Sequence, residues 1–142
     1  MLIPDLISKA GGIVLATITV CTAAMAQTDG ISPRDAHDAA RVGRAVLIDI
    51  RPAVERDDTG VAAGAIVLPA ETAGFEVRLA GLRLDQAGKQ IVLIDLAGTQ
   101  AFALVRVLRG RGWRDLTYLR GGMLGSPGEP GWLREKLPVD AR

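Results

Sequence analysis

The amino-acid sequence predicts an α/β fold in which a parallel sheet is covered by helices on both faces. Short apolar runs alternate with stretches of helical spacing along the chain, a pattern typical of parallel sheets. Two of these runs, over 45–50 and 90–94, are almost continuously apolar, as expected of strands buried on both faces. The chain has 142 residues, 49% of them hydrophobic, which suits one compact domain.

The first half of this domain begins with a helix that carries clear start signals. Ser32 can cap the helix, Pro33 suits its first position, and Asp35 lies in its first turn. Gly43 ends it. The elements that we expect here are a helix over 33–43, a strand over 45–50, a charged loop over 53–64 and a short strand over 65–69.

The second half repeats the alternation. The expected elements are a helix over 71–85, a strand over 90–95, a helix over 99–112, a strand over 115–119, a Gly/Pro-rich loop over 120–131 and a closing helix over 132–139. In parallel α/β proteins, the loop after a strand is where chemistry most often occurs. Asp95 is the first polar residue after the strand over 90–94, and no Cys, Ser or His follows it before the helix.

The N-terminal segment differs from the domain in composition. Residues 10–26 are apolar and uncharged and end in Ala-Met-Ala, which predicts a signal peptide over 1–26 with cleavage after Ala26. A linker over 27–31 and the domain over 32–142 follow. We therefore expect a periplasmic or secreted protein. The alternative is an uncleaved membrane anchor, since the run is just short of the roughly 20 residues that a spanning helix needs.

Cleavage removes the only cysteine, Cys21. The mature domain then contains no thiol, which excludes a disulfide, a thiolate nucleophile and a cysteine metal site within it. The net charge of +1 gives no indication of nucleic-acid binding. We expect no cofactor and no metal.

Four blocks of sequence stand in an order that resembles the rhodanese-like family. The matching residues include Asp49, Arg51 and Glu55 in the first block, Gly64 and Pro69 in the second, Gly98 in the third, and Gly121, Gly122, Trp132 and Pro138 in the last. The resemblance covers about 31–139. It implies a parallel sheet of about five strands, with an active-site loop at the carboxyl end of a central strand. In that family, a cysteine in this loop carries sulfur as a persulfide.

The departures from the family pattern lie in the site. By this alignment, Asp95 replaces the catalytic cysteine, Gln100 the loop arginine, Ala101 the following serine and Val61 the histidine of the second block. An insertion, "SPGEPG", precedes Trp132. A carboxylate oxygen is a poor nucleophile toward sulfur, and its charge repels anionic donors. We therefore expect no sulfurtransferase activity.

The sequence favours a binding or accessory module with a protein partner in the cell envelope. The predicted binding surface comprises Asp95, Leu96, Ala97, Gly98, Thr99 and Gln100, with the insertion beside it. Asp95 itself is predicted to accept hydrogen bonds from the free N–H groups of the following helix. The alternative is an enzyme, either a sulfurtransferase relative that uses a partner's thiol or a site of metal or phosphate chemistry at Asp95. A membrane contact is expected only if the N-terminus stays uncleaved.

The remaining polar candidates have structural interpretations. Asp49 and Arg51 are predicted to form a buried ion pair, and Glu55, Gly64, Gly121 and Gly122 to be structural. The sole histidine, His37, is predicted to lie at the surface. The arginines at the end of the helix over 99–112 and just beyond, Arg106, Arg109, Arg111 and Arg114, are expected on a solvated face.

Overall fold

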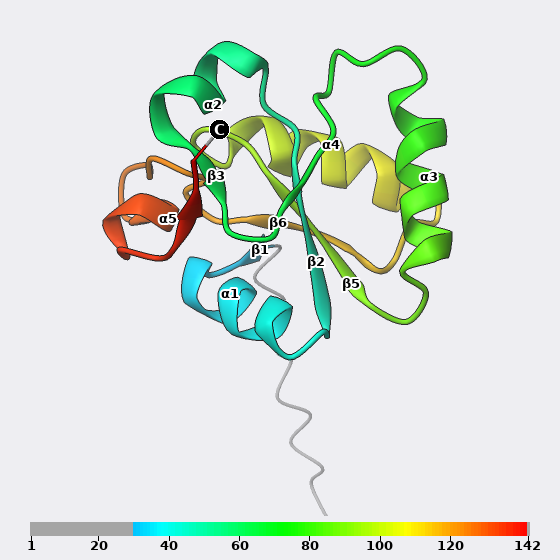
Figure 1. Ribbon diagram of the computed structural model, residues 1–142. Coiled ribbons are helices and arrows are strands. Elements are labelled where there is room, and N and C mark those ends of the chain that lie inside the picture. Colours follow the sequence, from blue (N-terminus) through cyan, green and yellow to red (C-terminus); the bar gives the residue numbers. More distant parts are fainter. Residues whose placement is uncertain (1–29, 142) are drawn as a thin grey trace, which may run out of the picture.

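The computed structural model describes residues 30–141, and the predicted signal peptide with Cys21 lies outside the described residues. One sheet of five strands has the order β1-β6-β5-β2-β4, and every neighbouring pair is parallel (Figure 1). These strands are β1 (Gly30–Ile31), β2 (Ala45–Asp49), β4 (Ile66–Val67), β5 (Gln90–Ile94) and β6 (Leu116–Leu119). The predicted α/β fold with a five-stranded parallel sheet is confirmed.

Within residues 30–141, five helices accompany the sheet. They are α1 (Pro33–Arg41), α2 (Ala53–Thr59), α3 (Phe75–Asp85), α4 (Thr99–Gly110) and α5 (Gly131–Arg134). Two further strands, β3 (Val61–Ala62) and β7 (Val139–Asp140), form an antiparallel ribbon. The predicted cap of α1 is present, because the Ser32 hydroxyl accepts a hydrogen bond from the Asp35 N–H at 3.2 Å. None of the helices within 30–141 has the length and apolarity to cross a membrane.

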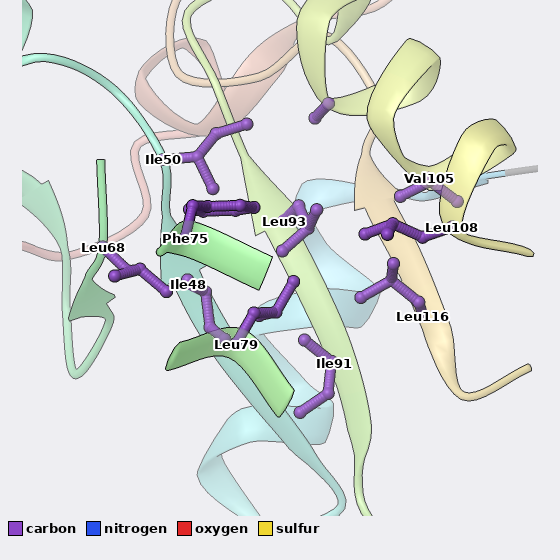
Figure 2. Packing of buried hydrophobic residues seen from close by; sticks show 11 residues of the cluster. Ile48, Ile50, Leu68, Phe75, Leu79, Ile91, Leu93, Val105, Leu108 and Leu116 are labelled. Atoms are coloured by element: carbon purple, nitrogen blue, oxygen red, sulfur yellow. The ribbon is translucent and has the colours of Figure 1, made fainter. Parts of the chain in front are cut away.

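Side chains that alternate along the central strands build a hydrophobic core on each face of the sheet. On one face, Ile48 of β2 and Leu93 of β5 pack with Leu79 of α3 and Leu108 of α4 (Figure 2). The neighbouring strand residues point the other way and pack with α1 and α5. The buried residues on this second face are Ala36, Ala45, Leu47, Ala62, Val92, Ile94, Leu119, Met123 and Trp132. Burial on both faces explains the continuous apolar runs.

Several expected elements differ from the observed ones. The segment over 53–64, predicted as a loop, contains α2 and β3. Residues 30 and 31, placed in a linker, form β1, which pairs with Tyr118 and Leu119 of β6. A two-residue strand has no detectable sequence pattern, and its backbone is ordered by the partner strand.

Two helices, α3 and α5, are each four residues shorter than predicted, whereas α1 and α4 end only two residues early. α3 begins at Phe75 rather than at residue 71, because Gly74 adopts a left-handed conformation with φ of 69°. α5 ends at Arg134, and Lys136 follows with φ of 53° before β7 begins. A left-handed residue cannot continue a right-handed helix, so the closing helix expected over 132–139 becomes a short helix followed by a strand.

Candidate functional site

The loop between β5 and α4 is organised around the Asp95 carboxylate. Oδ1 accepts a hydrogen bond from the Gly98 N–H at 2.6 Å, and Oδ2 accepts from Gln100 and Ala101 at 2.7 and 3.2 Å. Asp95 is 3% exposed. The last two donors belong to the first turn of α4, where the N–H groups have no partner within the helix. The capping hydrogen bonds predicted for Asp95 are therefore present.

Two glycines hold this loop close to the segment that follows β6. Gly98 has φ of 93°, and a Cβ at this position would lie 2.9 Å from the Gly121 nitrogen. Gly122 has φ of 53°, and its Cβ would lie 2.7 Å from the Ala97 nitrogen. Main-chain bonds lock the contact, since Met123 and Leu124 donate to the Asp95 and Leu96 carbonyls at 3.0 and 2.9 Å.

The outer side of the loop borders a cavity of about 240 Å³. Its lining residues are Ala97, Gly98, Thr99, Phe102, Tyr118, Arg120, Gly121, Ser126 and Glu129. Arg120 Nε lies 3.8 Å from the Glu129 carboxylate. No described residue makes a hydrogen bond with this Nε atom. The cavity thus joins the predicted loop, through Ala97, Gly98 and Thr99, to the insertion, through Ser126 and Glu129.

The predicted binding residues differ in their exposure to solvent. Thr99 and Gln100 are exposed, and Leu96 and Ala97 are partly buried. Asp95 and Gly98 are buried, and the Asp95 carboxylate is turned inward onto the loop amides. A partner at this surface therefore meets the rim of the loop and not the carboxylate.

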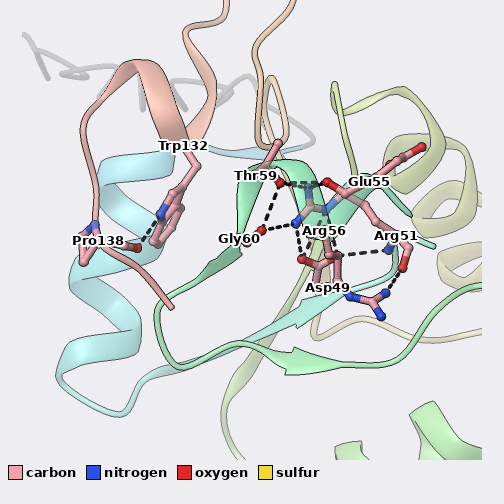
Figure 3. A network of polar contacts seen from close by, with 8 residues as sticks. All are labelled: Asp49, Arg51, Glu55, Arg56, Thr59, Gly60, Trp132 and Pro138. Atoms are coloured by element: carbon pink, nitrogen blue, oxygen red, sulfur yellow. Dashed lines mark hydrogen bonds and ion pairs between the residues drawn. The ribbon is translucent and has the colours of Figure 1, made fainter. Parts of the chain in front are cut away.

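A second polar cluster lies where β2 ends (Figure 3). Asp49 and Arg51 are both 0% exposed and form an ion pair with Nη2 and Oδ2 at 2.6 Å. Arg51 also donates to the Thr59 hydroxyl at 2.7 Å and to the Gly60 carbonyl at 2.9 Å. The predicted buried ion pair is present, and it fixes the C-terminal end of α2 to the sheet.

The other residues predicted to be structural have main-chain contacts. Glu55 takes part through its carbonyl, which lies 3.3 Å from Arg51 Nη1. The N–H of Gly64 donates to the Asp140 carboxylate at 3.0 Å, beside the β3–β7 ribbon. A Cβ on Gly121 would lie 2.9 Å from the Gly131 nitrogen, so this glycine permits the close approach of the insertion.

His37 is an exception among the remaining candidates. It was predicted at the surface, yet its side chain is 20% exposed and its ring lies edge-on to buried Trp132 at 5.8 Å. α1 packs on α5, and the sequence alone did not show which face of α1 does so.

Three of the four arginines around the end of α4 contact other groups of the protein. Arg111 pairs with Glu76 at 2.7 Å, Arg109 donates to the Leu116 carbonyl at 2.9 Å, and Arg106 lies over the Phe102 ring at 5.6 Å.

Within the described part of the chain, no group of three His, Cys, Asp or Glu side chains is arranged to hold a metal ion.

Arg120 is the site residue that sequence reasoning missed. It directly precedes the Gly121-Gly122 pair, and the cavity beside the loop gives it a place in the site. The one sequence feature that could have indicated Arg120 is that a charged residue directly follows the strand β6. Its distance from Glu129 depends on how the insertion folds, which no local pattern predicts.

Replacing Asp95 with alanine is expected to lower the free energy of unfolding by about 1–2 kcal/mol, because three loop amides lose their acceptor. Asp95→Asn keeps one acceptor oxygen and should cost less than about 1 kcal/mol. Urea unfolding of both variants measures the difference. Equal stability of Asp95→Ala and the native protein would show that the cap contributes nothing.

The fold has clear counterparts among solved structures, although no protein-family model matches this chain and no curated protein matches its sequence. A Rhodopseudomonas palustris protein of unknown function, described as a possible tyrosine phosphatase, has a TM-score of 0.58 at 16% identity. The match covers 78% of this chain and 83% of that one.

Two further neighbours have names that refer to rhodanese or to sulfur transfer. A rhodanese-related protein from Thermoplasma volcanium has a TM-score of 0.56 at 19% identity, covering 80% of this chain and 98% of its own. The polysulfide-sulfur transferase of Wolinella succinogenes, a homodimer, has a TM-score of 0.56 at 24% identity, covering 80% of each chain. The chain therefore has the rhodanese-like fold, with Asp95 at the start of the loop that joins β5 to α4.

Proposed function

We propose that this protein is a catalytically inactive rhodanese-like domain that serves as a binding module in the cell envelope. The observation that carries the proposal is the orientation of the Asp95 carboxylate. Its two oxygens accept the N–H groups of Gly98, Gln100 and Ala101, so the amides at this helix start are already neutralised by an internal anion. An anionic sulfur donor would have to displace that carboxylate.

A sulfur-carrying nucleophile is also absent from the part of the chain that the structure describes. Residues 30–141 contain no cysteine, and the position aligned with the family's cysteine holds Asp95. Sulfur transfer needs a thiolate that attacks a sulfane sulfur and then releases it to an acceptor. A carboxylate cannot form a stable equivalent of the persulfide.

Binding is supported by the surface that surrounds the filled loop. Thr99 and Gln100 are exposed at the rim, and the cavity of about 240 Å³ beside them contains Arg120 and Glu129. The insertion supplies one wall of that cavity, through Ser126 and Glu129. The lining combines apolar residues such as Ala97 and Phe102 with polar groups, and concave surfaces of this mixed kind commonly bind ligands.

The enzymatic alternative is less well supported. Chemistry at Asp95 with a metal or a phosphoryl group needs a free carboxylate oxygen, and both oxygens face loop amides. A sulfurtransferase that borrows a partner's thiol would use the same loop amides to hold the sulfur anion. Those amides are the ones that Asp95 occupies.

An activity assay separates these possibilities. The native protein should produce no thiocyanate from thiosulfate and cyanide, whereas Asp95→Cys with Gln100→Arg should produce it, because a thiolate would again be surrounded by loop amides. Turnover by the native protein would contradict the proposal. Asp95→Ala with Gln100→Arg is the matched control, since it opens the loop without supplying a thiol and should stay inactive.

Capture from the cell envelope tests the binding role of the same loop. Native bait should retain a protein that is lost with Thr99→Arg and kept with Val77→Arg, a change at another exposed residue, on α3. Loss with both variants, or retention with both, would contradict a role for the loop rim. Mass spectrometry of the bait adds the location, because an N-terminus at Gln27 supports export with cleavage.

A further inference from the structure

Helix α3 exposes apolar side chains along its outer face. Val77 and Leu84 are 77% and 78% exposed. They are seven residues apart, which is close to two helical turns, so they lie on the same side of the helix. Gly81 lies between them and is also exposed. In Figure 1, α3 is the outermost element on its side of the fold, so this face is open to solvent.

Gly81 is an unfavourable residue for the middle of an exposed helix. Glycine in a helix interior is less stable than alanine, because its backbone loses more freedom on folding. Its φ is not positive, and a Cβ there would meet no described atom within 4 Å, so neither the conformation nor the packing of the described residues requires glycine. Without a side chain at this point, the backbone of a second helix can approach α3 closely.

Two opposite charges lie on the same face. Arg78 and Asp85 are exposed, and neither side chain forms a hydrogen bond or ion pair with another described residue. At about 100° per residue, they lie about 60° and 40° to one side of Gly81. By the same measure, Val77 and Leu84 lie about 40° and 60° to its other side. The face therefore has a charged half and an apolar half.

This face is complementary to itself when two copies of α3 pack antiparallel. A two-fold axis that crosses the helix pair at Gly81 reverses the helix direction and keeps each half on its own side. Val77 precedes Gly81 by four residues and Leu84 follows it by three, so Val77 meets Leu84 of the second copy. In the same way, Arg78 meets Asp85 of the second copy. The symmetry repeats each contact.

We propose that α3 is a homodimer interface, in which two copies of the helix cross antiparallel at Gly81. Burial of Val77 and Leu84 stabilises the dimer, and the ion pairs between Arg78 and Asp85 select the antiparallel arrangement. One short helix per copy covers less than the roughly 1,000 Å² of a stable interface, so the dimer is weak and reversible, with a dissociation constant of about 0.1 mM. This face is separate from the Asp95 loop, so the proposal does not depend on the function assigned to that loop.

Sedimentation velocity of the full protein, at concentrations up to about 1 mM, tests the proposal by charge exchange. Arg78→Glu places a carboxylate opposite Asp85, and Asp85→Arg places a guanidinium opposite Arg78. Each variant alone should therefore dimerise at least about tenfold more weakly than the native protein. An equimolar mixture of the two should form a heterodimer about as tightly as the native dimer, because both contacts again join opposite charges.

Two further variants test the apolar half and the crossing point. Leu84→Glu should prevent dimerisation, whereas Val54→Glu, at an exposed valine on α2, is the matched control and should preserve it. Gly81→Gln should weaken dimerisation by at least about tenfold and raise the urea midpoint of the monomer, because glutamine favours a helix more than glycine does. Unchanged dimerisation of Gly81→Gln would overturn the assignment of Gly81 to the crossing.

Other results overturn the proposal as a whole. They are the absence of concentration-dependent association up to about 1 mM, association that persists in both charge variants, and a mixture of these variants that associates no better than either alone. Thr99→Arg should keep the dimer. Val77→Arg should weaken the dimer and still capture the envelope protein, so this test and the capture experiment fail independently.

Discussion

Replacing Arg51 with alanine is expected to lower the free energy of unfolding by about 3–5 kcal/mol. Arg51 and Asp49 are fully buried, and removal of the guanidinium leaves the Asp49 carboxylate in the interior without its cation. The Thr59 hydroxyl and the Gly60 carbonyl also lose a donor. Equilibrium unfolding in urea, monitored by tryptophan fluorescence and by circular dichroism, measures the change.

The matched control is Arg34→Ala. Arg34 also forms an ion pair, with Glu135 at 2.7 Å, but its side chain is 63% exposed. Its replacement should cost no more than about 1 kcal/mol, because solvent screens the pair. Asp49→Leu combined with Arg51→Met should cost less than Arg51→Ala, since no unpaired charge stays buried. A loss below about 1 kcal/mol for Arg51→Ala would show that α2 and the sheet do not depend on this pair.

Replacing Gly122 with alanine is expected to cost about 3 kcal/mol or more and to disturb the loop. A Cβ at this position would contact the Asp95 carbonyl oxygen and lie 2.7 Å from the Ala97 nitrogen, both backbone atoms that cannot rotate away. Overpacking of this kind costs about 1–3 kcal/mol. The left-handed φ of 53° adds about 1–2 kcal/mol for a residue with a side chain.

Gly88→Ala separates these two contributions. Gly88 also has a positive φ, 82°, but a Cβ there would meet no atom within 4 Å. It should therefore show the conformational cost of about 1–2 kcal/mol and no steric cost. Unfolding measurements give both values, and the amide resonances of residues 96–98 report on the loop. Equal losses for the two variants would contradict close packing between Gly122 and the loop.

Much of the fold could be predicted from local sequence patterns. The strands over 45–50 and 90–95 were predicted because they are buried on both faces and hence continuously apolar. The α1 helix was predicted from Ser32 and Pro33, whose effects are local. The cap formed by Asp95 was predicted for the same reason, since its donors lie within six residues of it.

Elements that are stabilised by residues distant in the sequence could not be predicted from it. α2 is a charged helix without a buried residue. Because it has no apolar face, residues 53–64 were predicted to be a loop. The structure shows that Arg51 anchors it, by hydrogen bonds to Thr59 and Gly60. β1 is likewise too short to recognise and exists because β6 supplies its hydrogen-bond partners.

The candidate sites divide in the same way. The sequence by itself determined that the loop after β5 holds a carboxylate and no thiol, because the identity of Asp95 and the positions of the following amides are properties of one short segment. The tertiary structure alone decided that Arg120 and Glu129 share a cavity with that loop. This proximity depends on the packing and lengths of separate segments, which local propensities do not encode.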